Sequence, residues 1–156
     1  MTESWHSVKA EDGACPPISV LVVDDYEPFR RFVSSTLRKQ PNLLIIGEAR
    51  DGVEAVQHAQ ALQPELIVLD IGLPKMNGIE AARAILEFSP DSKIIFLTQE
   101  SSLDVVEEAL GLGARGYVLK AQGESDLPAA VEAVVLGKQF VSSALQLHVS
   151  GTPKSA

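Results

Sequence analysis

The hydrophobic positions of this chain fall into five short apolar runs, and each is followed by a stretch with helical periodicity. The first run, Ile18 to Val23, is unbroken and rich in β-branched residues, which is typical of a strand covered on both faces. After it, Phe29, Phe32 and Val33 recur at the spacing of an amphipathic helix. The predicted strands cover residues 18–23, 43–49, 66–70, 93–98 and 116–120.

Turn-forming residues separate these strands from the helices that follow them. For the last helix, Asp126 is the expected N-cap, Pro128 lies in the first turn, and Gly137 ends the helix. The predicted helices cover residues 28–39, 53–62, 79–88, 103–112 and 127–136.

The alternation of strands and helices predicts an α/β fold with right-handed connections and helices on both faces of a parallel sheet. We expect a doubly wound five-stranded sheet with the strand order 2-1-3-4-5, formed by residues 18–137. Residues 1–17 mix charge, Gly and Pro and are expected to form a flexible leader. Residues 138–156 are expected to be a C-terminal extension or linker, in which residues 139–143 form a brief extended segment.

Length, charge and cysteine content narrow the functions that this chain can have. Its 156 residues suit one domain, and its formal net charge of -8 argues against a large nucleic-acid footprint. Cys15 is the only cysteine, so an internal disulfide is excluded. The N-terminal residues lack the pattern of a signal peptide, and no apolar stretch approaches the roughly 18 residues of a membrane span. We therefore expect a cytoplasmic protein with no membrane partner.

Polar side chains with related chemistry lie at the ends of four predicted strands. Asp24 and Asp25 follow the first strand, Asp70 ends the third, Thr98 the fourth and Lys120 the fifth. In an open parallel sheet, ligands bind outside the carboxyl ends of the strands, where the winding direction reverses. In the expected order the first and third strands are neighbours, so their carboxylates share one pocket. Only a long side chain such as Lys120 reaches that pocket from the fifth strand.

Three carboxylates in one pocket repel each other unless a cation lies between them. Mg²⁺ suits this set, because it binds carboxylate, water and phosphate oxygens. With the ion present, Asp70 can stay ionised and attack a phosphoryl donor, which forms an aspartyl-phosphate. Lys120 and the hydroxyl of Thr98 would stabilise charge on the phosphoryl oxygens, so Asp70, Thr98 and Lys120 form the predicted catalytic set.

Four ordered motifs resemble those of the receiver domain of bacterial two-component response regulators. The resemblance covers about three quarters of the chain, from Ile18 to Gly137, and implies a flavodoxin-like fold. The motifs are Val22-Val23-Asp24-Asp25, Leu69-Asp70-Ile71-Gly72-Leu73-Pro74-Lys75-Met76-Asn77-Gly78, Phe96-Leu97-Thr98 and Gly116-Tyr117-Val118-Leu119-Lys120.

The resemblance implies how the phosphoryl group and the metal ion would be held. Asp70 would be the phosphoacceptor, and Lys120 would form an ion pair with the phosphoryl group. Asp25, Asp70 and the carbonyl of Gly72 would bind Mg²⁺, and Asp24 would act mainly through water.

The resemblance also implies how the domain would signal. A sensor histidine kinase would donate the phosphoryl group, Thr98 would move inward, and Tyr117 would turn into the space that it leaves. This would alter the face made by the fourth helix, fifth strand and fifth helix, which is also the candidate face of a homodimer. The domain would assist its own phosphorylation and dephosphorylation without being an enzyme, and this chain would not contact nucleic acid directly.

Other functions are compatible with parts of the pattern. The motif around Asp70 and the segment 136–142 resemble the subfamily with a C-terminal helix-turn-helix, so the chain could be the receiver part of a DNA-binding transcription regulator. A phosphohydrolase is disfavoured, because Gly72 stands where such enzymes have an acidic residue. A degenerate receiver is disfavoured, because no acidic residue of the pocket is missing. Gln99 replaces a usually small residue and could crowd the approach of a donor.

Overall fold

Six parallel strands in the order β2-β1-β3-β4-β5-β6 form the sheet of the computed structural model, which describes residues 16–145. The strands are β1 (Ile18–Val23), β2 (Leu43–Ala49), β3 (Leu66–Leu69), β4 (Lys93–Thr98), β5 (Gly116–Leu119) and β6 (Phe140–Val141). The helices are α2 (Glu27–Arg38), α3 (Gly52–Leu62), α4 (Gly78–Phe88), α5 (Leu103–Gly111), α6 (Gly123–Val135) and the 3-10 helix η1 (Lys120–Gln122).

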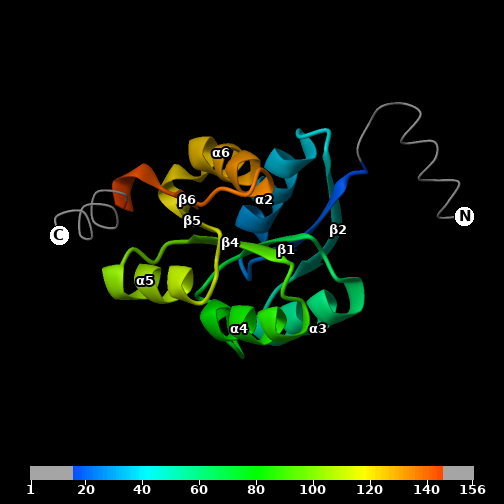
Figure 1. Ribbon diagram of the computed structural model, residues 1–156, viewed down its shortest axis with the longest axis horizontal. Helices are drawn as coiled ribbons and strands as arrows, with labels where there is room; N and C mark the ends of the chain where they lie inside the picture. The colour runs from blue at the N-terminus through cyan, green and yellow to red at the C-terminus, as the bar shows by residue number, and fades with distance from the viewer. Residues whose placement is uncertain (1–15, 146–156) are drawn as a thin grey trace, which may run out of the picture.

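The sheet separates two groups of helices, as Figure 1 shows. Helices α2 and α6 cover one face, and α3, α4 and α5 cover the other. Val20 and Val22 of β1 belong to the core on the first face, whereas Leu21 and Val23 belong to the core on the second. All four side chains are at most 2% exposed, so the unbroken apolar run does reflect a strand covered on both sides.

The predicted strand order is confirmed, but the prediction of five strands was one strand short. After α6 the chain returns to the sheet, and β6 pairs with β5 through Gly116 opposite Phe140 and Tyr117 opposite Val141. The extended segment expected over residues 139–143 contains β6, but two strand residues are too few for a sequence pattern to show that they join the sheet. Strand β6 lies beyond residue 137, the predicted end of the domain. Residues 1–15 of the predicted leader and 146–156 of the predicted extension lie outside the described residues.

The start of the last helix also differs from the prediction. Helix α6 begins at Gly123, with Gln122 as N-cap, so Asp126 lies inside the helix and not at its cap. Pro128 lies within the helix, where its missing N–H removes a single intrahelical bond. Strand β5 ends at Leu119, and Lys120 opens the short helix η1. Among residues 16–145, none of the helices has both the length and the apolar character needed to cross a membrane.

Candidate functional site

The register of the sheet brings the predicted residues together at the carboxyl ends of the strands. Asp24 and Asp70 directly follow the paired strands β1 and β3, so they lie side by side. Thr98, the last residue of β4, is paired with Leu119, the last residue of β5, and Lys120 comes next. The carboxyl ends of four neighbouring strands therefore supply the site, as expected for an open parallel sheet.

Three carboxylates form a tight cluster at these strand ends. Asp24, Asp25 and Asp70 each offer an oxygen, and these oxygens all lie within 4.8 Å of one another. The side chain of Asp25 is exposed, whereas Asp24 and Asp70 are 2% and 6% exposed. Burial raises the pKa of Asp24, although its hydrogen bonds from Lys120 and the backbone N–H of Tyr26 act in the opposite direction. The cluster combines two buried carboxylates with one that faces solvent.

Lys120 joins the two buried carboxylates. Its Nζ lies 2.8 Å from Oδ2 of Asp24 and 2.9 Å from Oδ2 of Asp70. It also lies 4.6 Å from the ring centroid of Phe29 on α2, in a cation–π contact. Burial alone would lower the pKa of Lys120, but the bonds to both carboxylates raise it overall. The ammonium therefore stays charged between the two acids.

Backbone groups hold the other oxygen of Asp70. Its Oδ1 accepts hydrogen bonds from the N–H of Ile71 at 2.7 Å and of Gly72 at 3.4 Å. The loop closes where Gly78 donates its N–H to the carbonyl of Ile71 at 2.7 Å. A Cβ at Gly78 would clash with the carbonyl oxygen of Asp70, so only glycine allows this close approach. The loop thus fixes the direction of the Asp70 carboxylate.

Thr98 and Tyr117 meet at a third residue. Thr98 is buried, and its Oγ1 accepts the N–H of Glu100 at 3.3 Å. Tyr117 is fully buried, and its Oη donates to the carbonyl of Glu100 at 2.7 Å. Burial is the main reason that the pKa of Tyr117 is raised. Its ring already occupies the inward position that we expected only after Thr98 had moved.

A cleft of about 590 Å³ opens above these residues. Two of the predicted site residues do not line the cleft: Asp24, which pairs with Lys120, and Tyr117, which bonds to Glu100. The cleft is lined by Asp25, Tyr26, Asp70, Ile71, Gly72, Thr98, Gln99, Glu100 and Lys120. The five other predicted residues, Gly72 among them, are therefore in its walls.

The donor set fits a hard divalent cation. All three side chains of the cluster offer carboxylate oxygens, which Mg²⁺ prefers, and the exposed Asp25 leaves an open side for water or phosphate ligands. In the described structure the Lys120 ammonium compensates the charge of Asp24 and Asp70. The chemistry of the cluster is thus compatible with the predicted magnesium site.

Two residues that contact the site were not predicted from the sequence. Phe29 had the spacing of a core residue, which gave no sign of its contact with Lys120. Arg30 donates to the backbone carbonyl of Asp24 at 2.8 Å and pairs with Glu48 at 3.0 Å, so it fixes the chain at the end of β1. An arginine in the first turns of a helix is common, so only its tertiary partners reveal this role.

Comparison with known proteins identifies the family. Residues 20–132 match the family model of the response regulator receiver domain. The nitrate/nitrite response regulator protein NarL of Escherichia coli K12 is 33% identical over 129 residues, which are 83% of this chain and 60% of NarL. The transcriptional regulatory proteins LiaR of Bacillus subtilis and DegU of Brevibacillus brevis are 36% and 32% identical over 81% and 80% of this chain. The chain spans 60% of LiaR and 52% of DegU.

Solved structures agree with this result. The two-component response regulator of the LuxR family from Aurantimonas sp. SI85-9A1 superposes with a TM-score of 0.83 and 26% identity, over 88% of this chain and 98% of that one. The signal receiver domain of the putative response regulator NarL from Mycobacterium tuberculosis gives 0.74 and 27%, over 80% and 100% of the two chains. These likenesses confirm the flavodoxin-like fold. The chain belongs to the receiver domain family of two-component response regulators.

Proposed function

We propose that this chain is a phosphorylation-dependent switch of a two-component phosphorelay, with Asp70 as its phosphoacceptor and a sensor histidine kinase as its donor. The observation that carries the proposal is the position of Asp70, whose two oxygens have different partners. Oδ1 accepts from backbone N–H groups, and Oδ2 accepts from Lys120 at 2.9 Å, beside an open cleft. This arrangement fixes the direction of the carboxylate and leaves it beside the open cleft, as a nucleophile requires.

The transfer forms one bond and breaks another. A carboxylate oxygen of Asp70 bonds to phosphorus while the bond from phosphorus to the donor breaks, and the donor leaves with the electron pair. Lys120, already beside Asp70, then pairs with an oxygen of the phosphoryl group, and the hydroxyl of Thr98 donates to another. The chain acts as a phosphoacceptor that assists its own phosphorylation and dephosphorylation. It is not an enzyme that turns over a separate substrate.

The acidic cluster would hold the metal ion. Asp25, Asp70 and the carbonyl of Gly72 would bind Mg²⁺, and Asp24 would reach it through water. When bound, the ion supplies positive charge to the phosphoryl oxygens. Asp24 and Asp70 can serve in this way because Lys120 is able to exchange its carboxylate partner for the phosphoryl group.

The response of the switch would pass from Thr98 to Tyr117. Both contact Glu100, so a shift of Thr98 toward a phosphoryl group would move the loop that holds the Tyr117 hydroxyl. Helix α5, strand β5 and helix α6 form the face next to Tyr117, and we propose it as the surface for a partner or homodimer. We place this activity in the cytoplasm, where histidine kinases deliver phosphoryl groups.

Intact-mass measurement after treatment with acetyl phosphate and Mg²⁺ tests the proposal. The wild type should gain one phosphoryl group, and Asp70→Asn should gain none. Asp91→Asn, in an exposed turn before β4, is the matched control and should react like the wild type. Equal labelling of the Asp70→Asn variant would remove Asp70 from its role.

A second candidate is the receiver part of a DNA-binding transcription regulator. It is supported by LiaR and DegU, which are named transcriptional regulatory proteins and of which this chain spans only 60% and 52%. The switch would then control an output domain and would not itself touch DNA. Sequencing the gene beyond the codon for Ala156 distinguishes the two, because a helix-turn-helix region would follow in this case only.

A further inference from the structure

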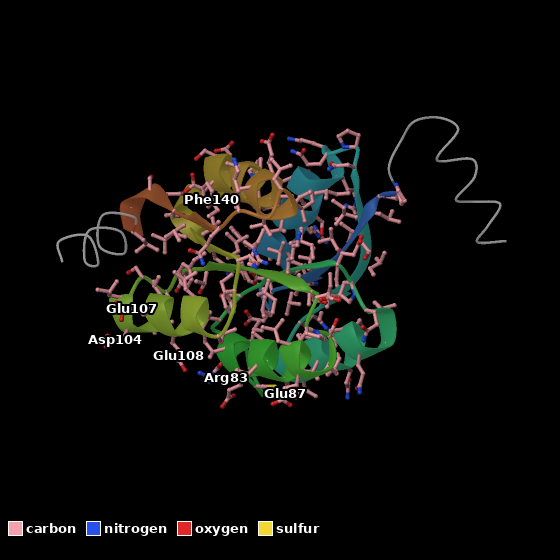
Figure 2. The ribbon with its side chains drawn as sticks, in the orientation of Figure 1. Arg83, Glu87, Asp104, Glu107, Glu108 and Phe140 are labelled. Carbon is pink, nitrogen blue, oxygen red and sulfur yellow. The ribbon has the colours of Figure 1, made fainter. Side chains whose placement is uncertain are left out.

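The segment that follows α6, residues 140–145, covers the edge of β5. Its two strand residues face opposite sides of the sheet: Phe140 packs with the α6 core and Val141 with the core that contains Tyr117. Figure 2 shows Phe140 on the α6 side, away from the labelled acidic side chains of α5. Leu145, at the end of the segment, is 5% exposed and lies in the same core as Tyr117. The segment is therefore packed into the domain.

Ser142 is the polar centre of this segment and is fully buried. Its Oγ accepts the N–H of Leu119 at 3.0 Å and donates to Oδ2 of Asp126 at 2.9 Å. Its own N–H donates to the carbonyl of Tyr117 at 2.9 Å. One side chain thus joins the end of β5 to α6, and all of its hydrogen-bonding groups are used.

We propose that Ser142 is a positioning residue for Lys120 and links residues 140–145 to the phosphorylation state of Asp70. Leu119 is the residue before Lys120, so the bond from Leu119 to Ser142 fixes the backbone from which the Lys120 side chain starts. The inference rests on the proposed function, in which Lys120 pairs with the phosphoryl group.

The link operates in both directions. Binding of a phosphoryl group at Asp70 strengthens, through β5, the bonds that Tyr117 and Leu119 make with Ser142. By thermodynamic reciprocity, whatever weakens the attachment of residues 140–145 also weakens the binding of a phosphoryl group at Asp70. The link therefore carries the state of Asp70 to Leu145, the last residue that the structure describes.

The test uses two serines that are adjacent in the chain. Ser142→Ala removes the buried hydroxyl, and Ser143→Ala, whose side chain is exposed, is the matched control. Beryllofluoride with Mg²⁺ serves as the phosphoryl analogue, and Mg²⁺ alone is titrated separately. We expect Ser142→Ala to bind beryllofluoride about threefold to tenfold more weakly, the size of one lost hydrogen bond, with Mg²⁺ affinity not reduced. Hydrogen exchange of residues 138–145 should respond to beryllofluoride in the wild type and in Ser143→Ala only.

Asp126 provides a second pair of variants should Ser142→Ala not fold. Asp126→Ala leaves the Ser142 hydroxyl without its acceptor and should weaken beryllofluoride binding in the same direction. Asp126→Asn keeps an acceptor oxygen for the Ser142 hydroxyl and should bind beryllofluoride as tightly as the wild type.

Three results would overturn the inference. One is beryllofluoride binding by Ser142→Ala equal to that of Ser143→Ala, and another is unchanged exchange of residues 138–145 on binding. The third is an equal loss of Mg²⁺ and beryllofluoride affinity, which indicates general destabilisation. Failure of the proposed function is distinguishable, because the wild type itself would then bind no beryllofluoride.

Discussion

The hydroxyl of Tyr117 donates a 2.7 Å hydrogen bond to the backbone carbonyl of Glu100. The N–H of Glu100 in turn donates to Oγ1 of Thr98 at 3.3 Å. The loop between β4 and α5 is therefore attached to the strand that carries Tyr117, and one residue joins the two proposed switch positions. Loss of either bond should loosen this loop.

Replacing Tyr117 by Phe tests the first bond. Tyr117→Phe keeps the buried ring and removes the donor, so we expect the free energy of unfolding to fall by about 1 kcal/mol. Tyr26→Phe is the matched control, because Tyr26 is 62% exposed. Urea denaturation of both variants measures the difference. Equal stabilities would show that the bond to Glu100 contributes nothing.

Lys120→Ala separates metal binding from the switch response. The variant should still bind Mg²⁺, and more tightly than the wild type, because the ammonium no longer competes for Asp24 and Asp70. It should lose the shift of α5 and α6 amide signals on addition of beryllofluoride. Calorimetry and NMR spectroscopy measure the two effects, and Lys138→Ala, which changes an exposed lysine, is the control. A normal amide response in Lys120→Ala would contradict the role of Lys120.

A methyl group at Gly78 should displace the loop that carries Asp70. Because the added Cβ would meet the Asp70 carbonyl, Gly78→Ala should lower the free energy of unfolding by about 2 to 3 kcal/mol. Gly111→Ala is the control, since a Cβ there meets no atom within 4 Å. Thermal denaturation compares the two variants. Similar melting temperatures would mean that the loop adapts without cost.

The pH dependence of stability should reveal the N-cap of α3. Asp51 accepts the N–H of Glu54 at 2.8 Å, and this bond, aided by the charge of Lys75, lowers the pKa of Asp51. A lowered pKa in the folded protein adds stability above the unfolded-state pKa, and this is lost as the pH falls through the folded-state value. The melting temperature of Asp51→Ala should therefore lie below that of the wild type at neutral pH, and the gap should close below about pH 3.9.

A control variant fixes the baseline of this comparison. Asp91→Ala changes an exposed aspartate outside any helix cap, so it reports the effect of removing a surface carboxylate. A gap between wild type and Asp51→Ala that widens in acid would contradict the assignment.

The position of the site followed from the sequence because it depends on topology. In a parallel sheet, the residues that end neighbouring strands must meet, so Asp24, Asp70 and Thr98 could be brought together without knowledge of any side-chain contact. The expected reach of Lys120 required only a strand spacing and a long side chain. These inferences rely on regular geometry.

The features that were missed depend on tertiary packing. The extended segment after α6 was expected, but its pairing with β5 was not, because two strand residues carry no pattern that predicts a partner. The start of α6 was misplaced because Asp126 looks like a cap, whereas its carboxylate is used by Ser142, 16 residues later. The inward ring of Tyr117 likewise depends on its bond to Glu100, which no local pattern encodes.

The short strand β6 also protects the outer side of β5. Without it, β5 would present unpaired backbone groups along its outer side, and such open strands invite other chains to add to them. A fragment that ends at Gly137, where the helical pattern stops, would lose this cover and expose the apolar flank of Tyr117. Eight further residues thus separate a protected sheet from one prone to aggregate.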